Sequence, residues 1–62
     1  MTNHEKIEEA FRTYLAESEN FEVKGVKASS ARARKALSEM GKLAKERRAE
    51  IQATVNARAE PY

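Results

Sequence analysis

The sequence contains no cysteine, no tryptophan and a single histidine, His4. Without cysteine the chain forms no disulfide, and one histidine beside the start of the chain does not provide a plausible zinc site. We therefore expect no metal and no cofactor. A chain of 62 residues buries only about 60% of its unfolded surface, so it usually needs a disulfide, a metal or a partner chain. A partner chain is the expected source of further burial.

Residues that could carry out catalysis are also missing. No serine has a basic partner at a spacing typical of a nucleophile. The two glycines, Gly25 and Gly41, are too far apart to form a phosphate-binding loop. The many carboxylates are expected on solvated helix faces. The sequence thus predicts no catalytic residues, and we expect that the protein is not an enzyme.

Long apolar runs are missing as well. No run approaches the roughly 18 residues that a membrane-spanning helix requires. The first residues are acidic and polar, unlike the basic start and apolar stretch of a secretory signal, so we expect a cytoplasmic protein. An amphipathic helix on a membrane surface is disfavoured, because the apolar positions are rich in alanine and tryptophan is missing.

Charge is present in abundance and is unevenly distributed, although the net charge is only +2. Residues 1–23 carry six acidic and two basic side chains, whereas residues 24–48 carry nine basic and two acidic ones. Such asymmetry indicates either a surface that meets polyanions or a basic segment that faces an acidic segment of another subunit.

The first segment has the pattern of an amphipathic helix over about residues 3–22, with Thr2 or Asn3 as its cap. Its aromatic residues are expected in the core rather than as platforms for stacking bases. The apolar stripe consists of Ile7, Ala10, Phe11, Tyr14, Ser18 and Phe21.

A connection at residues 23–28, around Gly25, is short enough to fold the chain back on itself. A second helix is expected over about residues 30–59, capped by Ser29 or Ser30 and stopped by Pro61. Residues 1–62 thus form one all-α domain, a two-helix antiparallel hairpin with a long second helix.

Apolar and small residues of the second helix alternate steps of four and three, as in a coiled coil. This seam consists of Ala33, Leu37, Met40, Ala44, Arg47, Ile51 and Thr54. The first helix is too short to cover its full length, so we expect a dimeric or larger helical bundle. The predicted oligomer interface consists of Leu37, Met40, Ala44, Ile51 and Val55.

Basic residues form an arc beside this seam, which could neutralise several phosphates along a nucleic acid. The arc consists of Arg34, Lys35, Lys42 and Lys45, with Arg48 at its edge. The alternative is ordinary surface pairing, since Glu39 and Glu46 each follow a lysine by four residues. The concentration of positive charge in residues 24–48 favours polyanion binding.

Three stretches show a family pattern: Lys24-Gly25-Val26-Lys27-Ala28, then Arg32-Ala33-Arg34-Lys35-Ala36-Leu37, then Lys42-Leu43-Ala44-Lys45-Glu46-Arg47-Arg48. Their order resembles the bacterial linker-histone-like nucleoid proteins, typified by the chlamydial histone-like protein. The resemblance implies sequence-independent DNA binding and a role in nucleoid architecture. The basic residues that it assigns to DNA are Lys24, Lys27, Arg32, Arg34, Lys35, Lys42, Lys45, Arg47 and Arg48.

The sequence departs from the family pattern in two respects. Val26 stands at the turn, where the family tends to have asparagine. Members of the chlamydial type continue into a long tail rich in lysine, alanine and proline, whereas this sequence stops at Tyr62. Without such a tail, we expect weaker DNA affinity or a protein whose main task is self-association.

The leading hypothesis is a small nucleoid-associated protein that contacts the phosphate backbone of DNA, rather than RNA, without reading sequence. The alternative is a helical protein-interaction module, such as a regulatory or phage adaptor, whose seam engages another protein. The sequence leaves the number and orientation of chains in the oligomer open.

Overall fold

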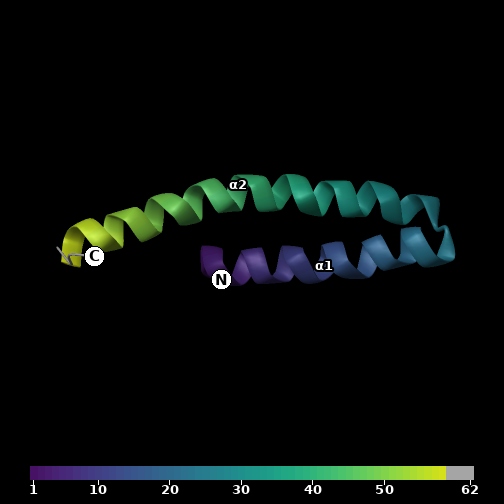
Figure 1. Ribbon diagram of the computed structural model, residues 1–62, viewed down its shortest axis with the longest axis horizontal. Helices are drawn as coiled ribbons and strands as arrows, with labels where there is room; N and C mark the ends of the chain where they lie inside the picture. The colour runs from purple at the N-terminus through teal and green to yellow at the C-terminus, as the bar shows by residue number, and fades with distance from the viewer. Residues whose placement is uncertain (59–62) are drawn as a thin grey trace.

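The computed structural model describes residues 1–58, which form two helices joined by two residues. Helix α1 spans Asn3–Lys24 and helix α2 spans Lys27–Arg58. The helices lie antiparallel, and α2 continues well past the start of α1 (Figure 1). The predicted all-helical hairpin with a long second helix is therefore confirmed.

The start of α1 is fixed by reciprocal hydrogen bonds between Thr2 and Glu5. The Glu5 amide donates to Thr2 Oγ1 at 3.1 Å, and the Thr2 amide donates to Glu5 Oε1 at 2.9 Å. This capping box satisfies two amides that have no partner inside the helix. The hydrogen bond from the Thr2 backbone, with that from its hydroxyl, lowers the pKa of the Glu5 carboxyl. Of the two predicted caps, Thr2 is thus the one used.

The turn is tighter than the sequence predicts. Gly25 adopts a left-handed conformation with φ of 69°, and its amide donates to the Phe21 carbonyl at 3.1 Å. The Val26 amide donates to the Asn20 carbonyl at 3.2 Å. Glycine takes this conformation without the steric cost that other residues meet. The connection therefore shrinks from the expected residues 23–28 to Gly25 and Val26, and α1 runs to Lys24.

The predicted serine cap of the second helix was wrong, because α2 begins at Lys27. Ser29 already lies in the first turn and is fully buried against the hairpin. The Ser30 hydroxyl donates to the Lys27 carbonyl at 2.7 Å, inside the same turn. Both serines thus belong to the helix instead of preceding it.

The surface between the helices is built from small residues. Among residues 1–58, the buried ones are Ala10, Ser29, Ala33 and Ala36. Small side chains allow the two helix backbones to approach closely. The expectation that Phe11 and Phe21 form the core was wrong: they are 49% and 42% exposed. Ala10 is the buried residue of α1, and Ile7, Tyr14 and Glu17 are among its half-buried ones. Phe11 follows Ala10 by one residue, so it lies about 100° around the helix from it.

The row of α2 that contacts α1 is likewise rotated from the predicted seam. Its buried and half-buried members are Ser29, Ala33, Ala36, Met40, Leu43 and Arg47. Three residues of the predicted seam belong to this row, whereas Leu37, Ala44 and Ile51 are exposed. The spacing of four and three residues is as expected, but Ala36 and Leu43 occupy the row in place of Leu37 and Ala44.

The covered part of α2 ends near Glu50, whose Oε2 accepts a hydrogen bond from Asn3 Nδ2 at 3.1 Å. Residues 51–58 extend beyond the start of α1 by about 12 Å, at 1.5 Å per residue (Figure 1). Along its length α2 curves gently over α1. Ile51 is 48% exposed at the beginning of the extension, so this end of α2 is uncovered, as the sequence predicted.

The close helix contact gives a direct test. Ala36→Leu should lower the free energy of unfolding by about 1–3 kcal/mol, because the three added heavy atoms would overpack the interface between the helices. Ala49→Leu, at an exposed position of the same helix, is the matched control and should change it by less than about 0.5 kcal/mol. Urea titration followed by circular dichroism measures both. Equal effects would contradict the close contact at Ala36.

Candidate nucleic-acid interface

The two helices carry opposite charge. Helix α1 has six acidic and three basic side chains, whereas α2 has nine basic and three acidic ones. Because the helices lie side by side, this difference gives the hairpin an acidic side along α1 and a basic side along α2. A helix with an excess of positive charge attracts the phosphates of a nucleic acid.

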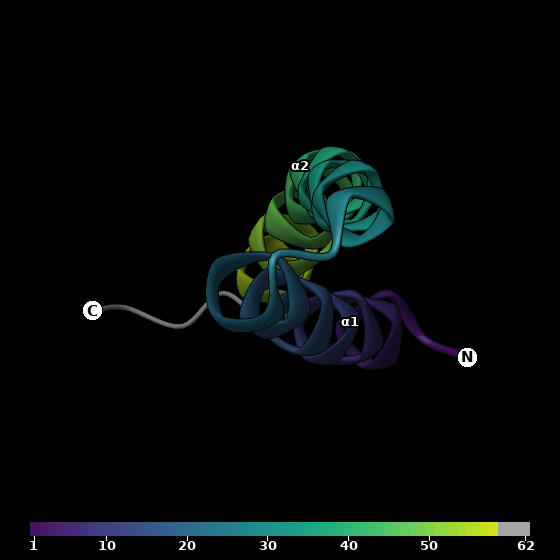
Figure 2. The same ribbon diagram turned by 90° about the vertical axis from the view of Figure 1, so that its right-hand side faces the viewer.

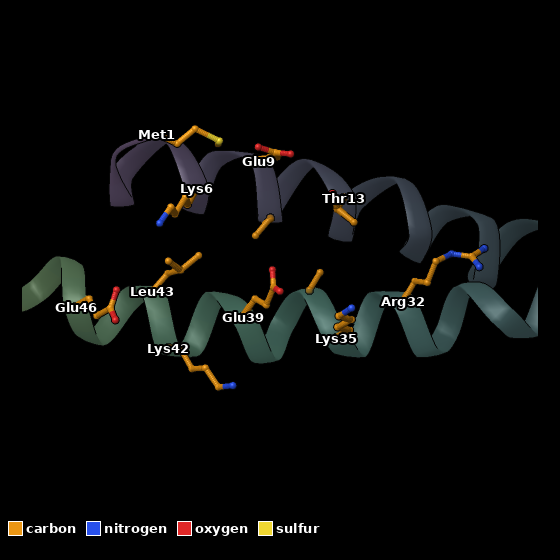
Figure 3. Close-up of a pocket in the computed structure, with 12 residues that line it drawn as sticks. Met1, Lys6, Glu9, Thr13, Arg32, Lys35, Glu39, Lys42, Leu43 and Glu46 are labelled. Carbon is orange, nitrogen blue, oxygen red and sulfur yellow. The ribbon is translucent and has the colours of Figure 1, made fainter.

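Six of the predicted DNA-binding residues on α2 are exposed and make no ion pair with any residue in the range 1–58. These six, which we call the basic face, are Lys27, Arg34, Lys35, Lys42, Lys45 and Arg48. Arg34 is two residues from Ala36, roughly half a helical turn, so it lies away from α1. Figure 3 shows the Lys42 side chain pointing away from α1. The basic face is thus open to a large partner.

Arg32 instead holds the hairpin together near its turn. Its Nε donates to Glu17 Oε2 at 2.6 Å, and its Nη2 donates to Ser29 Oγ at 3.2 Å. The hydrogen bond from Arg32, together with a weaker one from Ser29, lowers the pKa of the Glu17 carboxyl. Sequence reasoning assigned Arg32 to DNA and did not single out Glu17, because residues 15 positions apart meet only once the register of the hairpin is known.

Arg47 lies at the other end of the helix contact. It is half-buried, and its Nη1 lies 3.5 Å from Glu50 Oε1. Lys24, the remaining predicted residue, is exposed in the last turn of α1, where a positive charge interacts favourably with the helix dipole. The structure therefore gathers six of the nine predicted residues on the basic face of α2. It engages Arg32 and Arg47, on the same helix, in ion pairs and places Lys24 on α1.

The surface pairing considered as an alternative is not seen in the part of the chain that the structure describes. The salt bridges there join Glu8 with His4 and Arg12, Glu17 with Arg32, and Arg47 with Glu50. Neither Lys35 nor Lys42 takes part. Their ammonium groups are thus available to an external anion.

A shallow groove runs between the helices on one side of the hairpin (Figure 3). Its lining mixes four basic and three acidic side chains, among them Lys6 and Glu9 of α1 and Lys35 and Glu39 of α2. Mixed charge of this kind does not favour a single anionic ligand. Within residues 1–58 no cluster of histidine and carboxylate side chains could hold a metal ion, and neither helix is long and apolar enough to cross a membrane.

A comparison with protein families agrees with the presence of a basic helix that could contact DNA. The family model described as histone H1-like protein Hc1 matches residues 1–57. The chain belongs to the Hc1 family. It is therefore a histone-like, DNA-binding nucleoid protein by family, as the residues from Lys24 onward indicated. The match also includes all of α1, for which the sequence showed only a general likeness. Searches of curated proteins and of solved structures found no match.

The Glu17–Arg32 pair predicts how the stability of this Hc1-family hairpin depends on pH. Because folding lowers the Glu17 pKa below 4.5, the pair stabilises the fold fully above that pH and progressively less below it. Glu17→Gln should lower the unfolding temperature at neutral pH and reduce its fall on acidification. The fall caused by Glu5 should remain.

Thermal unfolding at neutral pH and at several values below 4.5 measures this effect. Glu9→Gln removes one negative charge from the same helix without touching an ion pair of the described chain, so it is the matched control. An unchanged acid dependence in Glu17→Gln would contradict the proposed role of the pair.

Proposed function

We propose that this Hc1-family chain binds the phosphate backbone of DNA through the basic face of α2, without reading base sequence. The observation that carries the proposal is the concentration of six exposed basic side chains on α2, none of them in an ion pair within the described residues. The acidic helix α1 lies on the other side of the hairpin, where it would be directed away from the phosphates.

The length of the basic face suits a duplex. From Lys27 to Arg48 it extends about 32 Å along α2, at 1.5 Å per residue. This is close to one turn of B-DNA, roughly 34 Å. Long lysine and arginine side chains can reach phosphates in many orientations, and each phosphate that they neutralise releases condensed counterions. Such contacts position a protein on DNA but carry no sequence information.

The same proposal includes self-association and a place in the cytoplasmic nucleoid, with no enzymatic activity. Self-association is supported by the small buried core and by the exposed Leu37 and Ile51 of the predicted interface. Nucleoid location is supported by the family match. The alternative of a protein-interaction module is not favoured by that match.

A titration of random-sequence duplex DNA with the protein tests the proposal, with mobility in a gel as the readout. We expect binding at low salt that weakens steeply toward physiological salt and differs little between unrelated duplexes. No binding at low salt, or strong preference for one sequence, would contradict backbone binding.

Two paired variants test whether the basic face makes the contacts. Lys35→Gln with Lys42→Gln should reduce the slope of log affinity against log salt by about 2, since each phosphate contact contributes about 1. Lys6→Gln with Arg12→Gln removes the same charge from α1 and is the matched control. Equal losses in the two variants would show that net charge, and not the basic face, decides binding.

A further inference from the structure

The hairpin has two unlike sides. In both helices, the residues that precede the buried row by one position line the charged groove: Glu9 and Thr13 of α1, and Lys35 and Lys42 of α2. Because the helices are antiparallel, residues that follow the buried row by one position share the opposite side. The apolar residues among them are Phe11 and Leu15 of α1 with Leu37 and Ala44 of α2, which we call the apolar face. Arg34 and Arg48 of α2 also follow the buried row by one position.

The apolar face is uncovered in the hairpin. Phe11, Leu15 and Leu37 are 49%, 50% and 48% exposed. Figure 2, an end-on view, shows α1 and α2 stacked, with no other described segment beside them. Among residues 1–58, the apolar residues that are buried are all alanines. A chain of this size gains too little from such a core to leave its larger apolar residues in water.

Charged residues border the apolar face in a matching pattern. Glu8 and Glu19 lie along its edge on α1, and Arg34 and Lys45 lie along its edge on α2. Each pair is 11 residues apart, about three helical turns or 16 Å. The contacts of Asn3 with Glu50 and of Glu17 with Arg32 set the helix register. This register places Glu8 about level with Lys45, and Glu19 about level with Arg34.

Two symmetric arrangements would cover the apolar face with a second copy of the chain. If the two-fold axis is perpendicular to the helices, α1 of one copy packs against α1 of the other, and α2 against α2. Acidic edges then meet acidic edges, and basic edges meet basic ones. If the two-fold axis is parallel to the helices, α1 of each copy packs against α2 of the other. Glu8 and Glu19 of each copy then lie level with Lys45 and Arg34 of the other. Glu8 also lies 3.8 Å from Arg12 on its own helix, an exposed pair that a new partner displaces at little cost.

We propose that two copies pair along the apolar face with α1 of each against α2 of the other, and that this dimer bridges two DNA duplexes. In this arrangement the two α2 helices lie at diagonal corners of a four-helix bundle. The outer edges of their basic faces, at Lys35 and Lys42, point in opposite directions. The bridging part of the proposal rests on the proposed binding of DNA by the basic face.

The mass of the protein in solution tests the dimer. Sedimentation equilibrium should give twice the mass of the chain, and Leu37→Asp should shift the protein toward one chain mass while circular dichroism still shows helix. Val23→Asp is the matched control, because Val23 is 75% exposed but lies outside the apolar face. A monomeric wild-type protein, or a dimer that Leu37→Asp leaves unchanged, overturns the proposal.

Cross-linking tests the arrangement without disturbing the fold, since the chain has no cysteine of its own. A mixture of Leu15→Cys and Leu37→Cys proteins should form mainly the mixed disulfide dimer on mild oxidation, because these positions face each other between copies. Ala44→Cys should form little dimer. Efficient Ala44→Cys dimers, with little mixed product from the first pair, would indicate like helices in contact and would overturn the proposed arrangement.

A bridging assay completes the test, with one duplex attached to beads and a second, labelled duplex in solution. The wild-type protein should retain the labelled duplex on the beads. Leu37→Asp should retain at least tenfold less while still binding a single duplex in a gel. If the wild-type protein does not bind a single duplex, the proposed function itself is contradicted. If it binds a single duplex but does not bridge two, only the two-sided dimer is overturned.

Discussion

The close contact between α1 and α2 is the constraint on which the rest of the structure depends. It is made by Ala10 on one helix and by Ser29, Ala33 and Ala36 on the other. Because these side chains are small, the helices approach closely and bury little apolar area. Phe11 and Leu37 lie beside this contact and remain exposed. The hairpin is therefore a thin two-helix layer whose sides are available for other contacts.

The hydrogen bonds and ion pairs at the ends of this contact fix its register. The Arg32–Glu17 pair and the buried Ser29 secure the end near the turn, and the Asn3–Glu50 hydrogen bond secures the other. The left-handed Gly25 closes the turn in two residues. A connection this short prevents the helices from shifting along each other. A fixed register matters for function, because it determines which charges of α1 lie level with which charges of α2.

The separation of charge between the helices connects this architecture to DNA. Helix α2 carries the excess of basic side chains, and its contact row consists of small residues with Met40, Leu43 and Arg47, so the six residues of the basic face lie outside the contact. Helix α1 carries most of the acidic side chains. The hairpin thus combines a basic outer surface, an apolar side and a mixed-charge groove, and the Hc1 family match explains the first of these. The other two follow from how the helices are rotated against each other.

The sequence by itself determined that the protein is a two-helix hairpin, that its second helix is long and basic, and that it is histone-like. Helix periodicity, the glycine at the turn and the order of basic residues are local features, so they can be read without a structure. Only the tertiary structure decided which residues meet. The sequence pattern placed both Ala10 and Phe11 on one apolar stripe and Leu37 on the seam, whereas packing in the hairpin buries Ala10 and Ala36 and leaves Phe11 and Leu37 exposed. A shift of one residue turns a helix face by roughly 100°, and neither hydrophobicity nor spacing resolves so small a rotation. For the same reason, the sequence could not show that Arg32 forms an ion pair with Glu17 of the facing helix. Nor could it show that Lys35 and Lys42 are exposed to solvent.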